Sequence, residues 1–346
     1  MTDKTDMPAR PDFAGSGGKT WLVYRLSALG DVALLSGVLD YWHRSRGWRF
    51  IVMTKEPYAD LFRQHPAVIG TEAVRPEDLA RPAAYFREVA ARYKGCGLLD
   101  LHGTLRSRLL GFFWKGEKRG YGKLSWERRL FLRLRTPSLA RRLRALNVPQ
   151  RYALAVEDTP PPARDVLPRL YLDESERTAA TERLAGIFGA GQAIAPLVLH
   201  PYATHALKQW PLENWRELAG LLDRHGLPWL VVGRGEGLFP GDARDLSNST
   251  SLRELCALLE GSSLLITGDS GPLHLGAAMR LPVLALFGPT TAEWGFFPAG
   301  ERDRVLELDL PCRPCSLHGA KGCAVNGECL RGIAPQQVLE AALSMR

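Results

Sequence analysis

The sequence predicts an α/β protein made of two domains, each with a parallel sheet that carries helices on both faces. At roughly 150 residues per domain, a chain of 346 residues has room for about two domains with a core each. Short apolar runs alternate with longer helical patterns, which is typical of parallel sheets. Residues 157–169, EDTPPPARDVLPR, interrupt this alternation with four prolines and mixed charge, which indicates a linker.

The first half of the chain contains three predicted strands separated by helical patterns. The strands are short apolar runs, and the helices have apolar residues at helical spacing. The predicted strands are residues 20–25, 48–53 and 97–101, and the predicted helices are 31–46, 57–64 and 76–93.

The second half repeats the pattern. Ser251 and Glu254 form a capping box, so a helix is expected to begin at Ser251, and another is expected to open at Pro272. The predicted strands are residues 197–200, 229–232, 264–267 and 283–287, and the further helices are 174–188, 212–225 and 335–345.

These elements divide the chain into five expected parts. The polar residues 1–18 contain no apolar core, so we expect a flexible leader there rather than a secretory signal. The other parts are a first domain over 19–160, a linker over 161–170, a second domain over 171–334 and a terminal helix over 335–346.

The composition is that of an ordinary globular enzyme. Apolar residues make up 45% and charged residues 24% of the chain, which argues against disorder. No stretch reaches the roughly 18 uninterrupted apolar residues of a membrane-spanning helix. Six cysteines are too few for a secreted disulfide scaffold of this length, so we expect a cytoplasmic protein.

Positive charge is concentrated in residues 103–144. This segment holds 13 Lys or Arg against two acidic residues, a net charge of +11, whereas the whole chain carries +8 and the remainder is therefore negative. A solvated helical face is the simple interpretation. The lopsided surplus also suits an anionic partner such as a nucleic acid, an acidic membrane or a phosphorylated substrate. Aromatic residues interrupt the basic ones, namely Phe112, Phe113, Trp114, Trp126 and Phe131.

Asp31 follows the first predicted strand in the loop SALGD, where Gly30 permits a close backbone approach. Asp is a favoured helix N-cap, and that role alone accounts for the residue. The functional alternative places its carboxylate at the carboxyl edge of the sheet, facing a cleft between the domains.

Two loops of the second domain also have the composition of a ligand site. Lys208 lies in HPYATHALKQWP, between a strand and a helix, where α/β folds bind phosphates. A lysine in a loop is usually only solvated, so this residue alone is a weak signal. In TGDSGPLHLGAA, Asp269, Ser270 and Gly271 precede a helix whose free backbone N–H groups favour an anion. His274 is either a core residue or a binding residue there. The run GRGEG after the strand at 229–232 lacks the spacing of a dinucleotide fingerprint.

Four late cysteines have the spacing C-x2-C-x7-C-x5-C. A CxxC pair suits a tetrahedral zinc or an iron–sulfur site, but the later intervals match no common zinc finger. We therefore expect free buried thiols, with a metal site as the alternative. The residues are Cys312, Cys315, Cys323 and Cys329.

The motifs together resemble the ADP-heptose:lipopolysaccharide heptosyltransferase family, glycosyltransferase family nine. The resemblance rests on RLSALGDV, DLHGTLRS, HPYATHALKQWP, GDSGPLHLGAA and LPVLALFGPT, and it extends into the PCRPC segment. It implies a GT-B architecture, in which two Rossmann-like domains face a central cleft. It also implies inverting, metal-independent transfer of a heptose from ADP-heptose to the lipopolysaccharide inner core, with no cofactor. The absence of any Asp-x-Asp agrees with a reaction that needs no metal.

The resemblance also implies residue roles. Asp31 would be the catalytic base and Lys208 the contact to the diphosphate. The donor would further meet Asp269, Ser270, Gly271 and His274, with Thr204 and Glu236 as hydroxyl and ribose contacts, and the acceptor would meet His102 and Arg106. The expected partners are an ADP-sugar, an anionic lipopolysaccharide-type acceptor and the inner membrane surface, at which the protein would be peripheral; no nucleic acid is expected.

Two other functions fit the same residues. One is a GT-B sugar-nucleotide enzyme with a different donor or acceptor. The other is a non-catalytic module that binds nucleotides or nucleic acid through its basic face.

Overall fold

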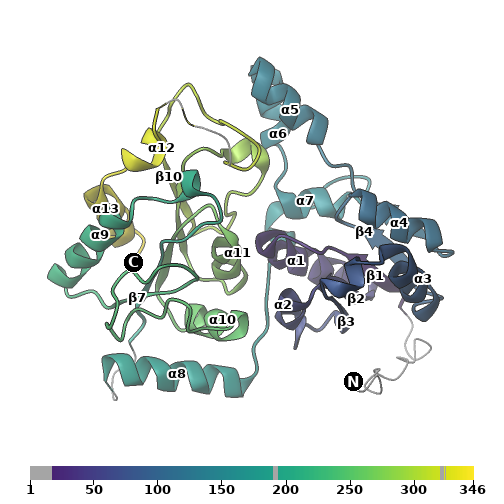
Figure 1. The fold of residues 1–346 in the computed structure, drawn as a ribbon, viewed down its shortest axis with the longest axis horizontal. Coiled ribbons are helices and arrows are strands. Elements are labelled where there is room, and N and C mark those ends of the chain that lie inside the picture. Colours follow the sequence, from purple (N-terminus) through teal and green to yellow (C-terminus); the bar gives the residue numbers. More distant parts are fainter. Residues whose placement is uncertain (1–17, 190–193, 320–322, 324) are drawn as a thin grey trace.

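The computed structural model describes residues 18–189, 194–319, 323 and 325–346. It contains two five-stranded parallel sheets that lie in separate halves of the chain, with strand orders β3-β2-β1-β4-β5 and β10-β9-β8-β6-β7. Figure 1 shows the two sheets side by side, each flanked by helices. The predicted α/β class with two parallel sheets is confirmed. Apart from Gly18, the predicted leader lies outside the described residues.

The first sheet is built around β1 (Thr20–Tyr24), in which all five residues are buried. Parallel strands covered on both faces are continuously apolar, which is why the sequence identified this strand and its neighbours β2 (Arg49–Lys55) and β4 (Gly97–Asp100). The sequence prediction missed the two edge strands. β3 (Val68–Val74) is half exposed, and β5 (Lys118–Gly120) is a short, exposed and charged strand.

Seven α-helices accompany this sheet. The predicted helix 57–64 is a single turn, α2, followed by a 3-10 turn at Asp60–Phe62. The predicted helix 76–93 is interrupted, because Pro82 disfavours helical backbone at the residue before it; α3 begins at Pro82 after a 3-10 turn. The helices are α1 (Leu29–Arg46), α2 (Glu56–Ala59), α3 (Pro82–Arg92), α4 (Leu105–Phe113), α5 (Ser125–Leu134), α6 (Pro137–Arg144) and α7 (Val148–Ala153).

The second sheet confirms all four predicted strands and adds an edge strand. β10 (Arg304–Glu307) was missed because it is largely exposed and carries charges at both ends. Ser251 caps its helix as predicted: its hydroxyl accepts from the Glu254 N–H at 3.2 Å, and Glu254 accepts from the Ser251 N–H at 2.7 Å. The other strands are β6 (Leu197–His200), β7 (Trp229–Val231), β8 (Leu264–Gly268) and β9 (Val283–Phe287); the helices are α8 (Glu174–Phe188), α9 (Leu212–Arg224), α10 (Leu252–Glu260), α11 (Gly271–Ala278), α12 (Glu328–Arg331) and α13 (Pro335–Ser344).

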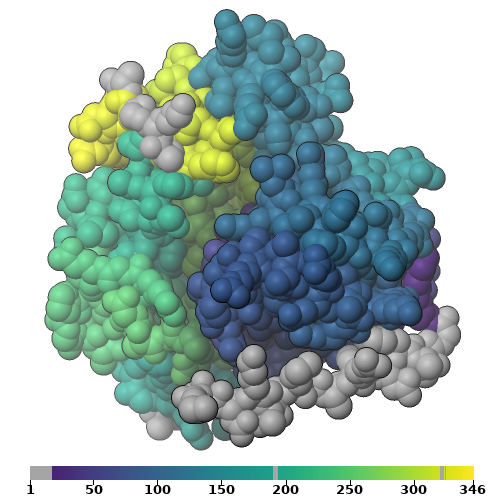
Figure 2. Space-filling view, turned by 45° about the vertical axis from the view of Figure 1, so that its right-hand side comes forward, coloured from purple at the N-terminus to yellow at the C-terminus, as the bar shows by residue number. Residues whose placement is uncertain are grey.

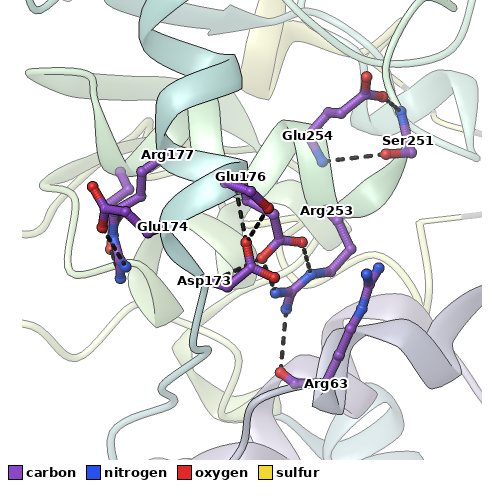
Figure 3. A network of polar contacts seen from close by, with 10 residues as sticks. Arg63, Asp173, Glu174, Glu176, Arg177, Ser251, Arg253 and Glu254 are labelled. Carbon is purple, nitrogen blue, oxygen red and sulfur yellow. Dashed lines mark hydrogen bonds and ion pairs between the residues drawn. The ribbon is translucent and has the colours of Figure 1, made fainter.

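The two domains meet where α1 packs against α11. A Cβ atom on Gly30 would lie 2.4 Å from Cδ2 of His274, so the helices approach this closely only because residue 30 has no side chain. Figure 3 shows a second junction, in which the Arg253 guanidinium pairs with Glu176 of α8 and reaches the Arg63 carbonyl of the first domain at 3.5 Å.

Helices α5 and α6 form an arm that reaches the second domain, at the top of Figure 1. The Arg135 guanidinium donates to four backbone carbonyls in the cysteine segment, at 2.5–3.2 Å. Arg144 pairs with Glu293 at 2.6 Å, and Arg128 donates to the Trp294 carbonyl at 2.9 Å. The basic segment is therefore in part a domain contact, and the simple interpretation of a wholly solvated face is wrong for these three arginines.

No helix within the described ranges combines the length and the hydropathy needed to cross a membrane.

Candidate functional site

A cavity of about 720 Å³ lies between the domains, at the carboxyl ends of the strands, where open α/β sheets bind ligands. The first domain contributes residues 28–30 at the start of α1 and residues around α2. The second domain contributes the loops after β6, β7 and β8 and the start of α10. Figure 2 shows the furrow between the two domains from one side.

Asp31 follows Gly30, the last residue of this loop that lines the cavity, and is not itself part of the lining. Its carboxylate lies 2.5 Å from the Arg25 guanidinium, accepts from the Tyr152 hydroxyl at 3.1 Å and accepts from the Ala28 N–H at 3.2 Å. The N-cap of α1 is Ala28, and Asp31 is the third helical residue. The expectation that Asp31 is the N-cap is therefore wrong, although its carboxylate still satisfies one backbone donor of the first turn.

The Arg25–Asp31 pair is buried, with the two side chains 6% and 17% exposed. Burial alone would raise the pKa of Asp31, but the charge and hydrogen bonds of Arg25, together with Ala28 and Tyr152, outweigh it and hold that pKa below its ordinary value. Asp31 is thus ionised at neutral pH and is a proton acceptor of low basicity.

Two further cations act on the same carboxylate. Burial and then the charge of Arg25 lower the pKa of Lys123, and burial lowers the pKa of Arg128. Arg128 also keeps a buried Nε without a hydrogen-bond partner in the described structure. The sequence analysis did not assign Arg25, Tyr152, Lys123 or Arg128 as site residues, although Lys123 and Arg128 belong to the basic segment that was expected to suit an anionic partner. A signal existed for Arg25 as well, a charge placed directly after a buried strand.

His102 supports the loop that carries Asp31. Its Nδ1 accepts from the Leu26 N–H at 3.0 Å, and burial lowers its pKa to about 4, so the ring is neutral at neutral pH. Arg106, the second residue of α4, is exposed and has no ion pair within the described residues. The two predicted acceptor residues therefore differ in environment.

On the second domain, Lys208 and Asp269 form an ion pair at 2.5 Å, with side chains 16% and 12% exposed. Thr290, the last residue of the LPVLALFGPT motif, donates its hydroxyl to the same Asp269 carboxylate at 2.6 Å. The structure thus brings together residues from three of the motifs and gives Lys208 a fixed position.

The start of α11 faces the cavity with Ser270 and Gly271. Ser270 is the N-cap residue, but its hydroxyl lies near Thr267 and His200 instead of bonding to the helix. The α11 backbone donors at this end therefore have no side-chain cap and are available to an anion.

His274 lies one turn into α11 and is only 4% exposed. Burial lowers its pKa to about 4, against the opposing effect of the Asp269 and Asp31 carboxylates. It lines a second cavity, of about 510 Å³, whose walls also include Leu34 of α1 and Ala277 of α11. The geometry favours the core interpretation over direct contact with the donor.

The remaining predicted donor residues are separated by the structure. Thr204 is exposed on the wall of the 720 Å³ cavity. Glu236 is exposed outside the lining, and its backbone carbonyl accepts from the Tyr202 hydroxyl at 2.7 Å. Gly233 and Arg234, which precede Glu236, do line the cavity. The loop after β7 therefore contributes these two residues to the cavity wall instead of the expected Glu236.

The four late cysteines lie near one another. Burial, and then the neighbouring Cys312, Cys329 and Cys323, raise the pKa of Cys315 to about 11. None of the four forms a disulfide, and the described part of the chain contains no group of three His, Cys, Asp or Glu arranged to hold a metal ion. The choice between thiols and a metal stays a prediction.

Comparison with known proteins identifies the family of the chain. The family model described as glycosyltransferase family 9 (heptosyltransferase) matches residues 97–321. Lipopolysaccharide heptosyltransferase 2 of Salmonella typhimurium is 26% identical over 275 residues, which cover 71% of this chain and 74% of the relative. Lipooligosaccharide heptosyltransferase 2 of Campylobacter jejuni is 34% identical over 107 residues, but the match spans only 31% of that relative and 30% of this chain.

Among solved structures, the ADP-heptose lps heptosyltransferase II of E. coli has a TM-score of 0.69 at 19% identity. The alignment covers 94% of this chain and 98% of the E. coli chain. At this identity the likeness concerns the fold, and it confirms the predicted GT-B architecture of two Rossmann-like domains.

Proposed function

Because the chain belongs to glycosyltransferase family 9, we propose that it is an inverting heptosyltransferase that uses ADP-heptose, needs no metal and acts on the lipopolysaccharide inner core. The observation that carries the proposal is the convergence of two ion pairs from opposite domains. Gly30, beside Asp31, lies directly against His274, and Gly271, two residues beyond Asp269, lies directly against Leu29, so the two pairs flank the junction of the domains.

The second domain supplies the donor side of the reaction. The uncapped start of α11 and the Lys208 ammonium are suited to a diphosphate. A diphosphate would compete with Asp269 for Lys208, and Thr290 keeps that carboxylate hydrogen-bonded when Lys208 turns away. The same groups stabilise the charge that develops on the departing ADP.

The first domain supplies the acceptor side. The acceptor hydroxyl attacks the anomeric carbon from the face opposite the diphosphate, its oxygen forms the new bond, and the bond to ADP breaks. The hydroxyl proton passes to Asp31. Because Arg25 lowers the basicity of this carboxylate, the proton transfers only once the new bond is forming and the hydroxyl has become acidic.

The acceptor is anionic in this proposal. Lys123 and Arg128 lie close enough to Asp31 for their charges to interact with it, and together with Arg25 they make its surroundings net positive. Such a site suits acidic sugars and phosphates. We place the enzyme at the cytoplasmic face of the inner membrane, where a lipid-linked acceptor of this kind is presented, and we assign no role to nucleic acid.

The test is a transfer assay with ADP-heptose and a heptose-free inner-core acceptor in the presence of a chelator. The proposal expects chelator-resistant release of ADP and a product whose anomeric configuration, read by NMR, is opposite to that of the donor. If the enzyme transfers sugar only from another sugar nucleotide, that compound is the donor and ADP-heptose is not. Salt-dependent RNA binding without turnover would support the non-catalytic alternative.

A further inference from the structure

Large apolar side chains are exposed on two helices of the first domain. Five of the eight large hydrophobic residues that are exposed within the described ranges lie on α4 and α5. We call these five the α4–α5 apolar surface: Leu105 (82% exposed), Phe112 (80%), Trp126 (79%), Leu130 (48%) and Leu134 (54%). Single exposed hydrophobics are common, but such a concentration on two short helices indicates an interaction site.

The spacing places these side chains in stripes. On α4, Leu105 and Phe112 are seven residues apart and so share one face of the helix. On α5, Trp126, Leu130 and Leu134 follow one another at intervals of four. The exposed stripe of α5 belongs to a helix that is anchored elsewhere, because Phe131 is buried against Trp294 with ring centroids 6.2 Å apart.

Cations lie beside the apolar stripes. On α5, Arg129 and Arg133 are exposed without ion pairs in the described structure, and the Arg129 guanidinium lies 6.0 Å from the Trp126 ring. On α4, Arg106 and Arg108 are exposed next to Leu105. Apolar side chains flanked by arginine are the composition of interfacial helices, which place the apolar side in the headgroup region and the cations at lipid phosphates.

We propose that the α4–α5 apolar surface inserts into the headgroup region of an anionic lipid bilayer. The inference rests on the membrane-side location in the proposed function and adds to it the residues and the mode of contact. Charge complementarity selects the occupant: a second copy of the chain would bring the arginines of both copies together, whereas an anionic leaflet pairs with them. Figure 1 shows α4 and α5 on the first domain, which carries Asp31, so docking would bring the acceptor side of the enzyme to the membrane.

Trp126 provides a direct reporter. It is strongly exposed, whereas Trp48 is half-buried and the other seven of the nine tryptophans are buried. The experiment measures binding of the full chain to vesicles of phosphatidylglycerol and phosphatidylethanolamine by sedimentation. It also measures quenching of tryptophan fluorescence by lipids brominated near the headgroup.

We expect binding to the anionic vesicles but not to phosphatidylcholine vesicles, and quenching that disappears in Trp126→Phe. Phe112→Ser together with Trp126→Ser should lower the vesicle partition coefficient about tenfold or more, because each removes a buried aromatic ring from the bilayer. The control is Leu343→Ser, a leucine on α13 that is 40% exposed and lies away from α4 and α5, and this variant should bind like the unaltered protein. Arg129→Glu with Arg133→Glu should weaken binding most at low salt.

Three outcomes would overturn the proposal: equal binding by the double serine variant, quenching that survives loss of the indole at position 126, or a lipid-free dimer that the serine substitutions dissociate. Transfer to a deacylated, water-soluble acceptor keeps this test separate from the proposed function. The serine variants should retain that activity, and loss of the transfer reaction itself would concern the proposed function and not the surface.

Discussion

Replacing Asp31 by Asn tests the proposed base, and the structure alters what this substitution should do. Asn keeps the volume of Asp, so the sequence alone predicts little loss of stability. The structure shows that the carboxylate pairs with an Arg25 side chain that is only 6% exposed. Asn is uncharged and cannot form an ion pair with Arg25. Its amide nitrogen is a hydrogen-bond donor and would face the Ala28 N–H and the Arg25 guanidinium, which are donors too.

The cost can be estimated from the burial of the pair. Removing one partner of a buried ion pair costs about 3–5 kcal/mol, and the lower value of about 3 applies because 17% of the Asp31 side chain still meets water. For a domain of this size, that loss lowers the melting temperature by roughly 6–12 °C. The variant should therefore fold, with reduced stability and near-normal donor binding. Loss of the proton acceptor should reduce kcat about 10²–10⁴-fold.

Arg25→Gln separates the base from the ion pair, because it breaks the same pair and keeps the carboxylate. We expect it to destabilise the protein by a similar amount but to retain at least tenfold more activity than Asp31→Asn. Burial of Asp31 is then unopposed by Arg25, so its pKa rises and the acid limb of the profile of kcat against pH moves to higher pH. The assays are thermal unfolding and heptose transfer over a pH series.

Two results would refute the reasoning about Asp31. Retention of more than about a tenth of normal turnover by Asp31→Asn would exclude general-base catalysis by this residue. Equal loss of activity in Asp31→Asn and Arg25→Gln would show that the pair holds the loop in place and that the proton has another acceptor.

Three further predictions concern the second domain and the buried histidines. Lys208→Ala should weaken binding of the ADP-sugar about tenfold or more and leave adenosine binding nearly unchanged, since a charge-assisted contact is worth about 1.5–3 kcal/mol; a loss below threefold in a titration would contradict it. His65, His200 and His274 are each at most 5% exposed, and burial lowers the pKa of each to about 4. The ordinary pKa of histidine is about 6.5, so between pH 6.5 and 4 the unfolded chain binds protons that the folded chain does not. The melting temperature should therefore fall as the pH falls from about 6.5 to 4. His274→Gln should reduce the dependence of stability on pH by about one proton, or 1.4 kcal/mol per pH unit. Elemental analysis of protein purified without chelator should find no stoichiometric zinc or iron, and finding either would identify the first ligands to substitute as Cys312, Cys315, Cys323 and Cys329.

The sequence by itself determined the central strands and the loops that carry the site. Strands β1, β6, β8 and β9 are buried on both faces, so burial alone requires a continuous apolar run that can be recognised without a structure. The loops at their carboxyl ends must then meet at one edge of each sheet. The edge strands β3, β5 and β10 could not be recognised in this way, because they are partly exposed and so lack a continuous apolar run.

Only the tertiary structure decided what each polar side chain does. The hydroxyl that donates to Asp31 comes from Tyr152, 121 residues away, and Arg128 is bound to a carbonyl 166 residues away. His274 is neutral because α1 covers it at Gly30, a contact between two domains that local composition does not specify. The charge and partner of a side chain depend on burial and on groups distant in sequence, whereas a strand is encoded in its own residues, and this is why the fold was predictable and the electrostatics of the site were not.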